Sequence, residues 1–161
     1  MKNKFLTQAA MIAALYVVLT YVANMLGLSS GVIQVRFSEA LTILPYFTPA
    51  AIPGLFVGCL LSNILAGGIL LDVIGGSLIT LAAAFVSYAL RKHKLLVCLP
   101  PIIGNTIGVP FILRYGYGIV EDSIPYMMLT VGAGEVISCG ILGILLLLAL
   151  SKQRNAIFGE Q

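Results

Sequence analysis

The sequence predicts an all-α, polytopic integral membrane protein, a bundle of six transmembrane helices with both termini in the cytoplasm. Three observations lead to this prediction. First, 60% of the 161 residues are hydrophobic and 9% are charged, whereas soluble domains carry roughly 25% charged residues. Second, several apolar stretches reach the ~20 residues that a helix needs to cross a bilayer. Third, the basic residues form short clusters of the kind that set membrane topology. No hydrophilic domain or linker interrupts the chain, so we expect one transmembrane domain over residues 1–161.

Four apolar stretches are each long enough to span a membrane, and they cover residues 6–28, 72–90, 95–113 and 124–150. The first stretch follows a basic N-terminus, as the apolar region of a signal peptide does. Its apolar run is too long for a signal peptide and no convincing cleavage site follows, so we expect a retained first helix. The stretch at 40–66 is harder to interpret, because it is longer than one span needs and short for two.

The basic residues decide how often the stretch at 40–66 crosses the membrane. They cluster in three places: Lys2 with Lys4, Arg91 and Lys92 with Lys94, and Lys152 with Arg154. All three clusters are cytoplasmic only if the chain crosses an even number of times before Arg91. We therefore predict two helices, at 34–48 and 50–67, joined by a tight turn at TPAA, where prolines suit a stop and a new start. The first of these is about 22 Å long at 1.5 Å per residue, so it must tilt or end in a protein-lined cavity.

The predicted topology places residues 28–34, 67–72 and 114–123 on the outer side. Two sequences rich in polar residues, GVIQVRFSEA and RYGYGIVEDS, lie there, so we expect a site that faces outward. Ionisable side chains within a membrane are costly, and each one is therefore a functional hypothesis. The predicted substrate-binding residues are Arg36, Glu39, Asn63, Asp72, Asn105, Tyr115 and Glu135.

Glu135 is the clearest of these candidates. It lies near the middle of a predicted span beside Gly132 and Gly134, and glycines allow another backbone or a flat ligand to approach closely. The amides of Asn105 and Asn63 each offer a donor and an acceptor, which suits the edge of a heterocycle. Hydrogen bonding between helices is the alternative role for the carboxylate and both amides.

The remaining candidates also have structural interpretations that stay open. Asp72 begins a predicted helix, where a carboxylate is a common N-cap. Arg36 and Glu39 are three residues apart and would share one helix face as a local ion pair. Tyr115 is an aromatic residue near the membrane boundary, where tyrosines commonly form a belt.

Several functional classes are excluded by what the sequence lacks. It has no HExxH or GxSxG motif and no glycine loop followed by lysine for phosphate binding, so we expect no enzymatic activity and no cofactor in this chain. Cys59, Cys98 and Cys139 lie far apart in apolar runs without metal-ligand spacing, so we expect no metal site. The net charge of +3 lies in separate clusters, which argues against nucleic acid as a partner. A carboxylate-rich pocket favours a neutral donor-rich or a cationic ligand over an anion.

Two parts of the sequence resemble known families. AAMIAALYVVLT places Ala9 with Ala13, and Ala10 with Ala14, four residues apart. This resembles the docking face on the first helix of the substrate-binding S components of energy-coupling factor (ECF) transporters. VRFSEALTILPYFTPAAIPGLFVGCLLSNIL, followed by LLDVIGGSL, is similar to the QueT family of S components for queuosine-precursor uptake. This second similarity covers essentially the whole chain.

The resemblance implies a six-helix protein of the bacterial plasma membrane that binds a deazaguanine-type base at its outer face. The partners that it implies are an ECF transmembrane scaffold subunit, on which the alanine face docks, and two ATPase subunits that use the ATP. A guanine-like edge presents adjacent N–H donors, which one carboxylate, Glu135 or Glu39, accepts in a bidentate manner. Asn105 and Asn63 pair with its carbonyl and ring nitrogens in this interpretation.

The rest of such a ligand has further candidate contacts. An aminomethyl cation would be held by Asp72 or Glu121, and Tyr115 or Phe37 would stack on the ring. Two other functions compete with this one. The chain is alternatively a small proton-coupled exporter with Glu135 as the proton site, or an integral-membrane enzyme acting on lipid or isoprenoid phosphates, although its carboxylates are scattered.

Overall fold

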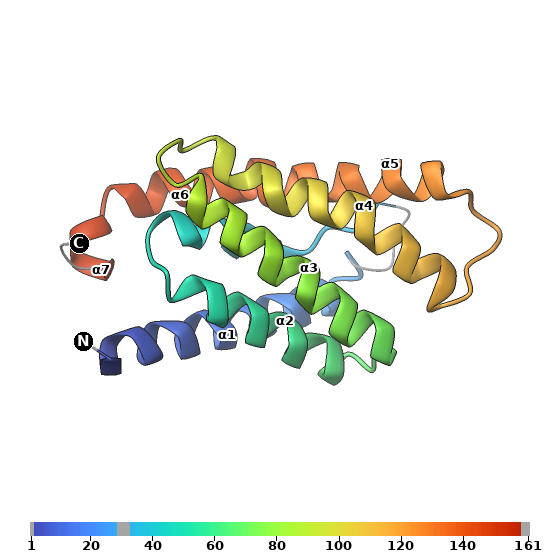
Figure 1. The fold of residues 1–161 in the computed structure, drawn as a ribbon, viewed down its shortest axis with the longest axis horizontal. Coiled ribbons are helices and arrows are strands. Elements are labelled where there is room, and N and C mark those ends of the chain that lie inside the picture. Colours follow the sequence, from blue (N-terminus) through green and yellow to red (C-terminus); the bar gives the residue numbers. More distant parts are fainter. Residues whose placement is uncertain (1, 29–32, 159–161) are drawn as a thin grey trace.

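A computed structural model describes residues 2–28 and 33–158, and within these ranges every regular element is helical (Figure 1). The six predicted helices are all present. In chain order the first five are α1 (Lys2–Met25), the 3-10 helix η1 (Phe37–Tyr46), α2 (Ala51–Leu65), α3 (Leu70–Ala89) and α4 (Leu99–Tyr115). The sixth is continuous and consists of α5 (Ile124–Glu135), the π-helical η3 (Val136–Gly143) and α6 (Ile144–Ser151). Two short elements were not predicted: η2 (Leu96–Cys98) and α7 (Arg154–Phe158).

Four helices in the described part of the chain are long and apolar enough to cross a membrane: Asn3–Met25, Leu70–Ala89, Leu96–Tyr115 and Ile124–Ser151. Each lies within a few residues of a predicted span. The apolar helix α2 is shorter, with 15 residues. Most of the predicted loop at 28–34 lies outside the described residues.

The helix boundaries follow from capping residues and prolines. The Ser123 hydroxyl accepts a hydrogen bond from the backbone N–H of Tyr126 at 3.4 Å, so Ser123 caps α5, and proline occupies an early position in α4 and α5, where no helical N–H is needed. Helix α2 ends at Leu65, and Gly67 follows with a φ of +74°, the left-handed conformation that favours glycine. The next N–H, of Gly68, bonds the Asn63 carbonyl at 2.8 Å. This turn brings the end of α2 back against the start of α3.

The two ends of the bundle differ in charge (Figure 1). The N-terminus, the loop between α3 and α4 and the end of the last helix lie together at the left of the view, so all three basic clusters share what we call the basic end. The α2–α3 turn and the α4–α5 loop lie at the opposite end, which we call the cavity end. The chain therefore traverses the bundle an even number of times between its N-terminus and Arg91, as the charge argument predicted.

The central element is η1, which differs from the predicted helix at 34–48. Residues 34–36 are not helical, and Arg36 has φ −115° and ψ 110°, so the prediction that Arg36 and Glu39 share a helix face is wrong. The helix has 10 residues and a length of about 20 Å at ~2.0 Å per residue. The Thr42 hydroxyl donates to the Glu39 carbonyl at 2.6 Å, a contact that a tight three-residue turn brings within reach. The predicted turn at TPAA follows η1, and the Ala51 N–H bonds the Thr48 carbonyl.

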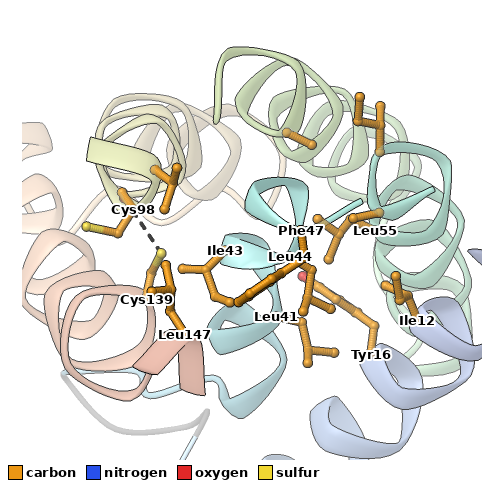
Figure 2. Close-up of a cluster of buried hydrophobic side chains, with 14 of the residues drawn as sticks. Ile12, Tyr16, Leu41, Ile43, Leu44, Phe47, Leu55, Cys98, Cys139 and Leu147 are labelled. Carbon is orange, nitrogen blue, oxygen red and sulfur yellow. Dashed lines mark hydrogen bonds between the residues drawn. The ribbon is translucent and has the colours of Figure 1, made fainter. Parts of the chain in front are cut away.

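Helix η1 is buried because the other helices surround it. It packs against α1, α3 and η3, and eight consecutive residues of it, Ser38 to Pro45, are buried. Figure 2 shows Leu41, Ile43 and Leu44 of η1 between α1 on one side and the η3–α6 helix on the other. At its basic end, Phe47 stacks on Phe158 of α7 with ring centroids 4.9 Å apart. Burial on every side places the polar residues of η1 in the middle of the protein.

Candidate functional site

A polar cavity of about 300 Å³ opens at the cavity end of the bundle. Ligand sites are commonly clefts of roughly 300–1,000 Å³. Its walls come from α1, the extended segment before η1, the α2–α3 turn, α4 and the loop after α4. The polar and charged side chains of its lining are Thr20, Asn24, Gln34, Arg36, Asn63, Asp72 and Tyr117.

One wall of this cavity is a hydrogen-bonded cluster around Asp72. The Tyr117 hydroxyl donates to Oδ2 of Asp72 at 2.8 Å, and Nδ2 of Asn63 donates to the Asp72 backbone carbonyl at 3.3 Å. Gly68 lies against the same group, since a Cβ added there would be 3.5 Å from both Asp72 Oδ2 and the Tyr117 hydroxyl oxygen. Partial burial, and then the hydrogen bond to Asp72, raises the pKa of Tyr117 above its ordinary value of 10.0. The phenol therefore stays protonated at neutral pH and donates to Asp72.

A second polar cluster lies on the buried face of η1. The Tyr16 hydroxyl donates to Oε1 of Glu39 at 2.5 Å, and Nδ2 of Asn105 donates to Oε2 of Glu39 at 3.4 Å. The exposed fractions of Tyr16, Glu39 and Asn105 are 2%, 2% and 6%. Both carboxylate oxygens of Glu39 thus have a protein donor from another helix. The cluster ties η1 to α1 and α4.

Glu135 differs from Glu39 because one of its oxygens has no protein partner. The residue is 7% exposed, and Oε2 makes no hydrogen bond within residues 2–28 and 33–158. It lines a small pocket of about 10 Å³ together with Gln34, Arg36 and two valines. Leaving a buried carboxylate oxygen without a donor is unfavourable. This oxygen therefore lacks the hydrogen bond that a buried carboxylate needs, and a donor outside the described residues would satisfy it.

Arg36 connects the two pockets. Its side chain lines both the 300 Å³ cavity and the small pocket beside Glu135. Its guanidinium makes one hydrogen bond with the described residues, from Nη2 to Oε1 of Gln34 at 3.5 Å. Its backbone N–H donates to Oγ of Ser138 at 3.0 Å. The backbone of Arg36 is thus fixed to the last helix, while most of the donors on its side chain have no hydrogen-bond partner among the described residues.

The last helix packs closely on the segment before η1. Gly134 packs directly on the backbone carbonyl of Gln34, and any added Cβ would clash with that oxygen. Thr42 Oγ1 lies 3.0 Å from Cys139 Sγ. The π-helical stretch begins at Val136, directly after Glu135, and π-helical turns often occur at functional sites. Small residues before and within η3 therefore position Gln34 and Arg36 beside Glu135.

Most of the predicted substrate-binding residues lie in this region. Arg36, Asn63 and Asp72 line the 300 Å³ cavity, and Glu135 lines the small pocket beneath it. Glu39 and Asn105 are buried behind these pockets and bond to each other. Glu39 lies in the first turn of η1 and is 2% exposed, so this helix begins inside the bundle and not at its outer surface.

Tyr115 lies apart from the other predicted residues. It is 73% exposed, and its ring stacks on Phe111 of the same helix with centroids 6.3 Å apart. Tyr117, which the sequence analysis left out of the site, lines the cavity instead. Tyr16 and Gln34 were also missed, since a tyrosine in an apolar run and a glutamine before Arg36 carry no distinctive signal. Glu121 is exposed in the α4–α5 loop.

The four alanines of α1 divide between two faces. Ala13 is buried, and α2 packs closely on Ala9 and Ala13: a Cβ added at Gly54 would lie 2.8 Å from the Ala9 carbonyl oxygen, and one at Gly58 would lie 3.1 Å from Cα of Ala13. Ala10 and Ala14 are exposed. Of the four alanines predicted to dock a partner, Ala9 and Ala13 therefore face α2, and Ala10 and Ala14 are the exposed ones.

Comparison with known proteins agrees with the resemblance seen in the sequence. The sequence model of the QueT transporter family matches residues 6–152. A curated protein of Lactococcus lactis subsp. cremoris (strain MG1363), named queuosine precursor transporter QueT, is 42% identical over 72 residues. That alignment covers 45% of this chain and 42% of the relative, so less than half of the relative's length is matched. No solved structure matches the chain.

Proposed function

Because this chain belongs to the QueT transporter family, we propose that it binds a queuosine precursor of the deazaguanine type as the S component of an ECF importer. The observation that carries the proposal is the buried carboxylate of Glu135, whose Oε2 has no donor in the described structure and which lies beneath an open polar cavity. A base with adjacent N–H donors supplies the missing hydrogen bonds. The name of the Lactococcus relative, which matches part of the chain, supports the same substrate class.

The cavity end faces the outside of the cell in this proposal. The positive-inside rule assigns the basic end to the cytoplasm, and the cavity lies at the opposite end. Helix η1 and α2 then complete six crossings of the bacterial plasma membrane. Capture from outside fits an importer, in which the binding subunit receives its ligand before the energising subunits act.

The cavity offers separate contacts for the two ends of such a ligand. Glu135 accepts the N–H donors of the base edge, and Asn63 contacts a ring nitrogen or carbonyl from the cavity wall. Asp72 holds a cationic substituent where the ligand carries one, since its carboxylate lines the cavity. Glu39 supports this site from behind, because both of its oxygens already accept protein hydrogen bonds.

The energising partners act through the accessible face of α1. The sequence has no phosphate-binding glycine loop, so uphill transport needs a partner that hydrolyses ATP. We place the scaffold contact at Ala10 and Ala14, where small exposed residues permit close helix approach. The partners are one transmembrane scaffold subunit and two ATPase subunits.

The proposal is tested by the small molecule that the purified protein retains. Mass spectrometry of the protein expressed in a queuosine-salvaging host should detect a deazaguanine base. Calorimetry with that base should show loss of affinity for Glu135→Gln of roughly 10- to 100-fold, from one charge-assisted hydrogen bond worth about 1.5–3 kcal/mol. Asp122→Asn, at an exposed carboxylate in the α4–α5 loop that has no assigned role in binding, is the matched control. If Glu135→Gln and Glu39→Gln both bind the base with normal affinity, the proposal that a carboxylate binds the ligand is wrong.

Glu135, whose Oε2 has no hydrogen-bond partner among the described residues, also fits a proton-coupled exporter, which is the second candidate function. The two functions differ in the assembly that they require. If the protein is an importer, purification from native membranes should recover a scaffold subunit and ATPases with it. If it is an exporter, it should purify without such partners. Proton-driven transport by this chain alone in liposomes would favour the exporter.

A further inference from the structure

Arg36 and Glu135 form an incomplete pair of opposite hydrogen-bonding character. Both line the same small pocket. The guanidinium has a single 3.5 Å hydrogen bond to Gln34 in the described part of the chain, and Glu135 Oε2 has none. Among the described residues, one side of the pocket therefore has guanidinium donors without hydrogen-bond partners, and the other has a buried carboxylate oxygen without one. A ligand group that fits between them must itself carry an acceptor and a donor side by side.

The pocket sizes show how such a ligand lies. The small pocket of about 10 Å³ is close to the minimum volume that holds one water molecule. It admits an edge atom of a ligand but no ring. Arg36 also lines the 300 Å³ cavity, which is large enough for the ring. The ring therefore lies in the cavity, with one polar edge directed toward Arg36 and Glu135.

We infer that Arg36 is a specificity-determining residue, and that Arg36 and Glu135 together recognise a lactam edge, a ring carbonyl next to ring N–H and exocyclic amino donors. The carbonyl accepts from the Arg36 guanidinium, and the N–H groups donate to the Glu135 carboxylate. This inference rests on the proposed function, because it assigns the orientation of the base in the same cavity. The opposite edge of the base then faces Asp72 and Tyr117.

The other polar residues near the pocket are less suited to this recognition. Glu39 has both oxygens occupied by Tyr16 and Asn105. Asn105 uses its amide nitrogen on Glu39 and is 6% exposed. Asn63 is bonded to the Asp72 backbone on the opposite wall. Arg36 is the charged donor that reaches both the cavity and the pocket of Glu135.

Three bases test this assignment by changing one edge group at a time. 7-Deazaguanine carries the whole edge, 6-thio-7-deazaguanine replaces the carbonyl oxygen with sulfur, a much weaker acceptor, while it keeps the ring N–H and the amine, and 7-deazahypoxanthine lacks the exocyclic amine. Their dissociation constants are measured with the purified full chain in nanodiscs. Wild type should bind 7-deazaguanine roughly 10- to 100-fold more tightly than either analogue, as expected for loss of a charge-assisted hydrogen bond.

The variants should separate the two preferences. In Arg36→Gln, the preference for the carbonyl should fall close to one while the preference for the amine stays. In Glu135→Gln the amine preference should fall and the carbonyl preference should stay. Arg36→Lys keeps a cationic donor and should retain part of the carbonyl preference. Arg91→Gln, the same change at the basic end, should bind all three bases as wild type does, and thermal unfolding of each variant checks its folding.

Four outcomes are decisive. A carbonyl preference that persists in Arg36→Gln would overturn the inference, and so would the joint loss of both preferences in a folded Arg36→Gln and Arg36→Lys. Failure of wild type to bind any of the three bases at millimolar concentration would instead refute the proposed function. Equal binding of all three bases by wild type would also overturn the inference, because the protein would then bind bases without recognising this edge.

Discussion

The hydroxyl of Tyr16 donates a hydrogen bond to Glu39, so the middle of α1 is tied directly to the buried helix at the centre of the bundle. Asn105 of α4 donates to the other oxygen of the same carboxylate. Glu39 is therefore a structural junction of three helices. Glu135, whose Oε2 has no hydrogen-bond partner among the described residues, is the carboxylate that we propose for the ligand. Partners, rather than depth in the membrane, distinguish the two residues.

Tyr16→Phe should destabilise the protein without acting at the binding cavity. The change removes one donor from a buried carboxylate and leaves its oxygen unsatisfied, at a cost of about 1–3 kcal/mol. Thermal unfolding in detergent should show a lower midpoint for Tyr16→Phe than for Tyr21→Phe, whose side chain on the same helix is 52% exposed. Equal midpoints for the two variants would show that the Tyr16–Glu39 bond contributes nothing to stability.

Gly134→Ala should weaken ligand binding by moving the segment that carries Arg36. The added methyl group meets the Gln34 backbone carbonyl, which is not the flexible end of a side chain, and such overpacking costs typically about 1–3 kcal/mol. We expect reduced affinity and a lower unfolding midpoint. Gly140→Ala is the control, since its Cβ would make ordinary contacts at 3.7 and 3.8 Å with Val136 and Ile102. Unchanged affinity in Gly134→Ala would show that ligand binding does not depend on the position of Gln34.

The bond from Tyr117 to Asp72 should persist to alkaline pH. Partial burial and this hydrogen bond raise the pKa of Tyr117 above 10.0. A raised pKa means that the contribution to stability is fully present below the unfolded value and is lost as the pH rises through the folded value. The difference in unfolding midpoint between wild type and Tyr117→Phe should therefore be constant from about pH 7 to 9 and shrink above about pH 10. A difference that already shrinks near pH 8 would contradict the assigned donor.

The number of helices could be predicted from the sequence because membrane spans depend on the summed hydrophobicity of a stretch and on the charges that flank it. Four spans are long apolar runs, and the charge clusters required an even number of crossings before Arg91. The conformation of η1 could not be predicted in this way. Its residues Phe37–Tyr46 form a buried 3-10 helix because helices that are remote in sequence surround it, and local helix propensity does not encode that environment.

The candidate site was predictable in residue type and less so in detail. Charged and amide residues within a membrane identified Arg36, Asn63, Asp72 and Glu135, all of which line the two pockets. Tyr115 and Tyr117 are two positions apart in RYGYG. Helix α4 ends at Tyr115, so Tyr115 lies on the helix surface, whereas Tyr117 follows the helix and lies on the cavity wall. The division of the alanines likewise depends on which face α2 covers.

Leucine substitutions on the two faces of α1 should separate docking from folding. Leucines at Ala10 and Ala14 enlarge an exposed face, so ligand binding and the unfolding midpoint should stay near wild type while cellular uptake is lost. Leucines at Ala9 and Ala13 force side chains against Gly54 and Gly58 of α2, so the unfolding midpoint should fall and binding should fall with it. Radiolabelled uptake in cells that carry the energising subunits, with calorimetry on the purified variants, measures both effects. Since a docking face acts only through the partner, uptake that survives in the Ala10 and Ala14 variant would place the scaffold contact elsewhere on the protein.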